Sequence, residues 1–167
     1  MTDHQLHPNL AAEVRIDVTP ESAGWRYLSF RELALKAGSA HIHHTHDTEV
    51  AIVPLSGEGV VRVGGQSFPL ARESVFAGKP HVVYVPPKHE IAIEAKSDVE
   101  FTLGGAPAEG KYPVRMFKPE EMKSEMRGGG AALRQVNHVL AAPLPAALLI
   151  LCEVYVPGGT WSGGSGL

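Results

Sequence analysis

The chain has 167 residues, of which 44% are hydrophobic, so it is long enough to bury one core of ordinary size. Its formal net charge of −3 gives no basic surface for a nucleic acid or an anionic membrane. The single cysteine, Cys152, excludes an internal disulfide and favours a reducing compartment. Residues 1–14 lack signal-peptide features, and the most apolar run, residues 146–152, is far shorter than the ~20 residues that span a bilayer. We therefore expect a cytoplasmic protein with neither a membrane nor a nucleic-acid partner.

Apolar and polar residues alternate along much of the first hundred residues, with glycine- and proline-rich turns between the alternating segments. Residues 50–55 form a continuous apolar run that predicts a strand buried on both faces. The sequence Ser56-Gly57-Glu58-Gly59 predicts a turn directly after it, and Gly64-Gly65 predicts a hairpin. Two-residue alternation interrupted by frequent turns is typical of a β-sandwich or barrel. The sequence therefore predicts an all-β fold.

The segment of residues 104–113 is rich in glycine, alanine and proline and predicts a linker. A short strand is predicted over residues 114–117, followed by one helical turn that begins at Pro119. Two further strands are predicted over residues 133–139 and 148–156.

Four histidines and two acidic residues lie within the nine residues from His41 to Glu49. A His–x–His pair on a strand places both imidazoles on one face, about 7 Å apart along the backbone. Imidazole and carboxylate together suit a divalent transition metal such as Zn, Mn or Fe. Five residues separate Gly38 from His44-Thr45-His46, a spacing that resembles the first metal-binding motif of the cupins, which are jelly-roll β-barrels.

One candidate metal site consists of His44, His46 and Glu49. Its spacing is shorter than that of the motif, since only two residues separate His46 from Glu49. A second cupin motif usually adds a histidine after a Pro–x–Gly turn, and Pro86-Pro87-Lys88 occupies that turn here. His89 follows it and is therefore the fourth candidate ligand.

A second register of the same cluster competes with the first. It uses His41 and His43 with Asp47, which stands at the expected spacing for the carboxylate. Strand alternation places His41 and His43 on one face and the other histidine pair on the opposite face. The sequence leaves both registers open, together with the interpretation that these histidines are solvated or paired with neighbouring acids. His138, outside the cluster, is predicted to lie in a turn.

Several short segments, in order along the chain, resemble the 5-deoxy-glucuronate isomerases of inositol breakdown. They are Gly24-Trp25-Arg26-Tyr27-Leu28-Ser29-Phe30, Glu49-Val50, Pro54-Leu55-Ser56-Gly57, Ser74-Val75-Phe76, Tyr84-Val85-Pro86-Pro87, Arg134-Gln135-Val136-Asn137 and Glu153-Val154-Tyr155-Val156-Pro157-Gly158-Gly159-Thr160-Trp161-Ser162. The resemblance implies a double cupin that converts 5-deoxy-glucuronate to 5-dehydro-2-deoxy-gluconate, an aldose-to-ketose isomerisation. It implies no catalytic residue in this chain, because the metal-binding histidines of the family are expected just beyond the Trp161-Ser162 position.

The resemblance also suggests how the chain is divided. We expect an N-terminal arm over residues 1–23, a cupin barrel over 24–106, a linker and the first strands of a truncated second cupin over 107–162, and a flexible tail over 163–167. Two functions remain open: an isomerase of small sugar acids, inactive as a fragment in one interpretation, or a non-catalytic or metal-binding cupin that dimerises or binds a small sugar acid. A homodimer is expected because the strand over 148–156 would leave an edge free for pairing.

Overall fold

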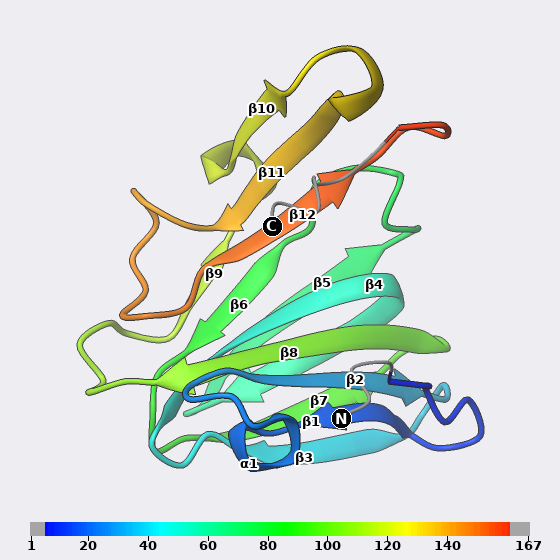
Figure 1. The fold of residues 1–167 in the computed structure, drawn as a ribbon. Coiled ribbons are helices and arrows are strands. Elements are labelled where there is room, and N and C mark those ends of the chain that lie inside the picture. Colours follow the sequence, from blue (N-terminus) through cyan, green and yellow to red (C-terminus); the bar gives the residue numbers. More distant parts are fainter. Residues whose placement is uncertain (1–5, 161–167) are drawn as a thin grey trace.

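The computed structural model describes residues 6–160, so the tail predicted over 163–167 and the Trp161-Ser162 pair lie outside the described residues. Figure 1 shows a β-barrel with a small, separate sheet packed against it. The all-β fold predicted from the alternation is confirmed. In the described range, no helix combines the length and apolar character needed to cross a bilayer.

The barrel strands share one antiparallel network. They are β1 (Val14–Val18), β2 (Ser29–Leu35), β3 (Ala40–His44), β4 (Thr48–Val63), β5 (Gln66–Arg72), β6 (Val82–Val85), β7 (Glu90–Ala95), β8 (Val99–Pro107) and β9 (Arg115–Phe117). The small sheet consists of β10 (Lys123–Arg127), β11 (Arg134–Leu140) and β12 (Leu151–Tyr155). Within residues 6–160, helical structure is limited to α1 (Pro20–Ala23) and the 3-10 turns η1 (Pro119–Glu121) and η2 (Gly130–Ala132).

The barrel has two layers that share one strand. The first layer has the order β1-β2-β8-β4-β6-β9, and in the second layer β7 lies between β3 and β4, while β5 pairs with the other edge of β4. Both β1 and β9, which flank residues 24–106 in the sequence, pair into the first layer, β1 with β2 and β9 with β6. Apolar side chains from both layers fill the interior, among them Leu33, Ile52, Val61, Ile91, Ile93 and Phe101.

The turn predicted over Ser56–Gly59 is wrong, because β4 runs through it without interruption. A register shift between Pro54 and Ser56, together with the positive φ of 82° at Gly57, bends β4 from the first layer into the second. Glycine is required here by close packing: a Cβ on Gly57 would lie 2.2 Å from the carbonyl oxygen of Asp98. The glycines that suggested a loop therefore mark a sharp bend in a long strand.

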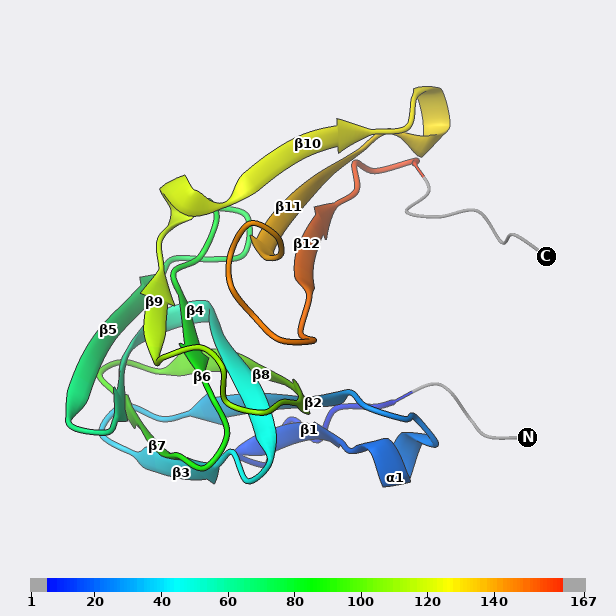
Figure 2. The same ribbon diagram turned by 90° about the vertical axis from the view of Figure 1, so that its left-hand side faces the viewer.

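The small sheet packs on the outer face of the first layer through a second apolar core. From the barrel this core includes Ala51, Val53, Val82, Tyr84, Ala106 and Phe117; from the following segments it includes Met122, Val139, Leu140 and Leu149. Figure 2 shows the chain leaving the barrel through β9 and continuing into β10. His138 lies within β11, paired with Lys123 on one side and Cys152 on the other, so its predicted position in a turn is wrong.

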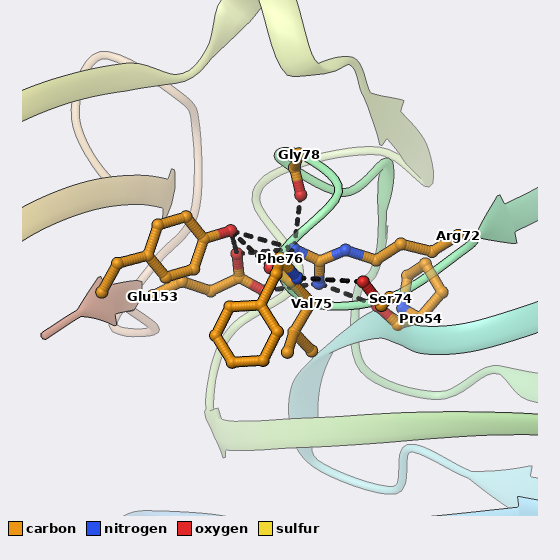
Figure 3. A network of polar contacts seen from close by, with 8 residues as sticks. Pro54, Arg72, Ser74, Val75, Phe76, Gly78 and Glu153 are labelled. Atoms are coloured by element: carbon orange, nitrogen blue, oxygen red, sulfur yellow. Dashed lines mark hydrogen bonds and ion pairs between the residues drawn. The ribbon is translucent and has the colours of Figure 1, made fainter. Parts of the chain in front are cut away.

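A buried arginine connects the barrel to the small sheet (Figure 3). The guanidinium of Arg72, at the end of β5, donates to both carboxylate oxygens of Glu153 in β12, at 2.6 and 2.9 Å. It also donates to the carbonyl oxygens of Pro54, Val75 and Gly78. The Arg72 side chain is only 3% exposed. Because its charge is paired and both of its terminal nitrogens donate hydrogen bonds, this bidentate contact fixes where the small sheet sits.

Replacing Arg72 with alanine is expected to destabilise the protein by about 3–5 kcal/mol, because Glu153 would keep a largely buried charge without a partner. Arg62→Ala is the matched control, since Arg62 makes a similar contact with Glu94 but at the surface, with half of its side chain exposed. This exposed pair is expected to contribute far less to the free energy of unfolding than the buried pair, because solvent screens it. Urea unfolding of both variants measures the difference, and equal losses would contradict the role given to Arg72.

Candidate functional site

The histidines of β3 alternate between the inside and the outside of the barrel. His41 and His43 pair with Ile93 and Ile91 of β7, whose side chains are fully buried, so both histidines share the inward face. Between them, Ile42 is half exposed. The sequence prediction that His41 and His43 share one face of a strand is therefore confirmed.

His43 lines a pocket of about 300 Å³ at the end of the barrel where β2 begins and β3 ends. Arg31 donates to His43 Nδ1 at 3.0 Å and to the Asp17 carboxylate at 2.7 Å. Ser29 and Thr48 add hydroxyl groups to the lining. The pocket thus combines one guanidinium with imidazoles, hydroxyls and two carboxylates in a small concave space, which is typical of a site for a small polar ligand. The imidazoles include those of His44 and His46, and the carboxylates are those of Asp17 and Glu21.

The tautomer of His43 is fixed by Arg31. A guanidinium has no acceptor, so the Nδ1 of His43 must accept the hydrogen bond and the ring proton must reside on Nε2. Burial, and secondarily the charge of Arg31, lowers the pKa of His43 to about 4. At neutral pH the ring is therefore an uncharged hydrogen-bond donor facing the pocket through Nε2.

Sequence reasoning missed Arg31 and Asp17. They face each other across the β1–β2 ladder, fourteen positions apart in the chain. Each is an ordinary charged residue in an alternating segment, so no local pattern singles it out. The pairing of β1 with β2 is the only signal that could have brought them together.

Glu49, predicted as a metal ligand, is completely buried between the barrel and the segment before β12. Its Oε2 accepts from the Tyr84 hydroxyl at 2.7 Å and from the Ala147 amide at 2.8 Å. Its Oε1 accepts from the amides of Leu148 and Leu149, both at 2.7 Å. Four donors occupy the two oxygens, so the carboxylate anchors a loop to the barrel and has no free site for a metal ion.

The remaining predicted ligands lie near the β3–β4 turn. His44, His46 and His89 line a shallow surface pocket together with Asp47 and the Lys88 amine. The rings of His44 and His46 are 6.0 Å apart, and His89 is oriented by a 2.8 Å contact between its Nδ1 and the Pro87 carbonyl oxygen.

His41, of the second register, instead contacts the Glu13 carboxylate through Nδ1 at 2.6 Å. Among residues 6–160, no three His, Cys, Asp or Glu side chains converge in a way that could hold a metal ion. The donors present therefore do not fit a divalent metal in either register: the carboxylate of the first is occupied by hydrogen bonds, and the histidines of the second point into the barrel.

The strand order and the apolar interior define the class of antiparallel β-barrel proteins, and comparison with known proteins identifies the family. The model of the KduI/IolB family matches residues 4–163. The chain therefore belongs to the KduI/IolB family.

Two curated relatives of the chain share the name 5-deoxy-glucuronate isomerase. The 5-deoxy-glucuronate isomerase of Geobacillus thermodenitrificans (strain NG80-2) is 36% identical over 158 residues, which cover 93% of this chain and 57% of that protein. The 5-deoxy-glucuronate isomerase of Bacillus subtilis (strain 168) is 32% identical over 150 residues, covering 87% of this chain and 55% of that protein. The chain thus spans somewhat more than half the length of these relatives.

A solved structure supports the same assignment. The crystal structure of an IolB-like protein from Salmonella typhimurium LT2 superimposes with a TM-score of 0.88 at 29% identity, covering 93% of this chain and 60% of that one. The cupin-type barrel expected from the sequence is confirmed. The incomplete second cupin over residues 107–162 stays a prediction.

Glu49→Gln is expected to lower the free energy of unfolding by about 3 kcal/mol. The amide removes the charge that three backbone N–H groups and one hydroxyl share, and its NH₂ group would face those donors. Asp47→Asn, two positions away and exposed, is the matched control, with an expected change below about 0.5 kcal/mol. Urea unfolding measures both; a loss confined to Asp47→Asn, or no loss in either variant, would contradict the anchoring role.

The protein is expected to lose stability as the pH falls from about 6.5 to about 4. In this window the unfolded chain binds a proton at His43, whose ordinary pKa is 6.5, while the folded chain does not until about pH 4. The slope of unfolding free energy against pH should therefore be smaller in His43→Gln than in the wild type. His7→Gln, at an exposed position, should keep the wild-type slope. Equal slopes for wild type and His43→Gln would show that His43 titrates normally.

Proposed function

We propose that the protein serves the aldose-to-ketose isomerisation of the sugar acid 5-deoxy-glucuronate, and that the described chain supplies a pocket that binds this acid. Membership of the KduI/IolB family, with curated relatives named 5-deoxy-glucuronate isomerase, is the observation that carries the proposal. The pocket at His43 supports it, because its groups match the chemistry of a hydroxylated carboxylic acid.

The pocket offers complementary partners for both parts of such a ligand. The guanidinium of Arg31 can attract the carboxylate, and its position is fixed by Asp17 and His43. The Nε2–H of neutral His43 and the hydroxyls of Ser29 and Thr48 can exchange hydrogen bonds with sugar hydroxyls. A volume of about 300 Å³ lies at the small end of the range for ligand pockets, as a six-carbon acid requires.

Binding is favoured over proton transfer as the role of this pocket. An isomerisation that moves a hydrogen from C2 to C1 needs a base for the C2 proton and an electrophile at the carbonyl oxygen. A base works best when its pKa lies near the working pH, and the pKa of His43 is about 4. A divalent metal, which would polarise the carbonyl when bound, stays a prediction from the sequence, because the donors described here do not fit it.

A non-catalytic cupin that binds a sugar acid is the second candidate function. The same neutral, firmly oriented His43 favours it, because this ring binds well and accepts protons poorly. The homodimer expected from the sequence stays a prediction. Within residues 6–160 the outer edge of β12 pairs with no further strand, which leaves room for such pairing.

Titration calorimetry with 5-deoxy-glucuronate tests the pocket. We expect saturable binding to the wild type, and Arg31→Gln should weaken it at least about tenfold, or ~1.4 kcal/mol, since a charge-assisted contact is lost. Arg62 lies in the part of β4 that pairs with β5 and β7, so the Arg62→Gln variant should bind the acid like the wild type. Circular dichroism checks that both variants fold. Absence of binding by the wild type, or equal binding by Arg31→Gln, would overturn the assignment of this pocket.

Proton NMR of the same mixtures measures how fast the ketose product forms. We expect binding without appreciable conversion by the purified chain, with or without added Zn²⁺ or Mn²⁺. Rapid conversion would contradict the binding-only role of the chain while supporting the isomerisation.

A further inference from the structure

The face of the small sheet that points away from the barrel carries a row of reactive side chains. Glu153 of β12 contacts Arg72 of the barrel, so the residues of opposite parity in β12, including Cys152, face outward. Cys152 is directly opposite His138 of β11, and Glu125 of β10 lies on the same face. Three adjacent strands thus place a thiol, an imidazole and a carboxylate on one face, with Glu125 two residues along β10 from the position opposite His138.

The contacts among these three side chains determine which of them donates and which accepts a hydrogen bond. His138 Nε2 lies 3.1 Å from Glu125 Oε1, and His138 Nδ1 lies 3.6 Å from Cys152 Sγ. Hydrogen bonds from Lys123, His138 and Arg127 lower the pKa of Glu125 to about 2, so this carboxylate is ionised and can only accept. In its neutral form His138 therefore carries its proton on Nε2. Its Nδ1 lone pair is left facing the thiol.

This arrangement provides the thiol with an oriented base. Partial desolvation of the sulfur raises the pKa of Cys152, so at neutral pH the thiol carries its proton and needs a base to become nucleophilic. The Cys152 side chain is exposed, so an electrophile can reach it. A nucleophile next to a base that a third group orients is the geometry of covalent catalysis.

The same face also has a charge preference. Lys123, Arg127 and Arg134 lie on it, against the single carboxylate of Glu125. The excess positive charge favours ligands that carry a carboxylate.

We propose that Cys152, His138 and Glu125 form a nucleophilic thiol site for small carboxylate-bearing carbon electrophiles. Cys152 is the nucleophile, His138 is its base and Glu125 is a positioning residue. With an aldehyde acid, Sγ bonds to the carbonyl carbon, the π electron pair moves to oxygen, and the thiol proton passes through His138 to that oxygen. The product is a thiohemiacetal, and no oxidant or reductant is consumed. This site is separate from the His43 pocket and does not depend on the isomerisation.

Alkylation by iodoacetamide tests the nucleophile, and mass spectrometry reports Cys152 alone because it is the only cysteine. Here Sγ bonds to carbon, iodide leaves with its electron pair, and the proton passes to His138. At pH 7.5 we expect a rate on the order of ten- to a hundredfold above that of N-acetylcysteinamide. His138→Gln should abolish this excess, and His7→Gln should keep it. A wild-type rate at or below that of the model thiol would overturn the proposal.

Two measurements on the folded wild type keep the test independent of variant folding. Nitrogen-15 NMR should find the proton of the His138 ring on Nε2; a proton on Nδ1 would overturn the assignment of the base. The ratio of iodoacetate to iodoacetamide rates should be higher for Cys152 than for N-acetylcysteinamide, and Arg134→Gln should reduce it. An equal ratio would overturn the preference for carboxylates.

Discussion

The structure depends on a buried carboxylate. Glu49 carries its charge into a region closed to water, where an unpaired ion would be very costly. Four donors meet it: one hydroxyl from the barrel and three consecutive amides from the segment before β12. Each partner needs the others, because the amides have no alternative acceptor in this geometry and the carboxylate no alternative donor. Arg72 and Glu153 form a second buried charged contact, in the middle of β12.

These two polar anchors hold an apolar interface in register. The core around Tyr84 and Phe117 supplies most of the area removed from water, but apolar contact has little directional preference. The hydrogen-bonded charges select one orientation of the small sheet, because only that orientation pairs them. Burying these charges costs desolvation free energy, and its effect is to select one orientation of the small sheet rather than to add net stability.

The polar pocket has a different origin. It lies at the end of the barrel, where the strands diverge and side chains no longer fill the interior. The inward position of His43 follows from the pairing of β3 with β7, while the position of Arg31 follows from the pairing of β2 with β1. The outward row of Cys152, His138 and Glu125 arises in the same way, from three strands in register. In both places the polar side chains that lie together come from different strands and not from one strand.

The sequence by itself determined the all-β class, the Gly64-Gly65 hairpin and the shared face of His41 and His43, because alternation and turn residues act over a few neighbours. Tertiary structure decided the rest. The glycines near residue 57 signal a turn locally, yet the approach of Asp98 makes them a bend within β4. Glu49 lies close to a His–x–His pair and was therefore a candidate metal ligand, yet amides about a hundred residues later occupy its oxygens. Strand pairing and long-range donors fix these outcomes, and neither is encoded in local spacing.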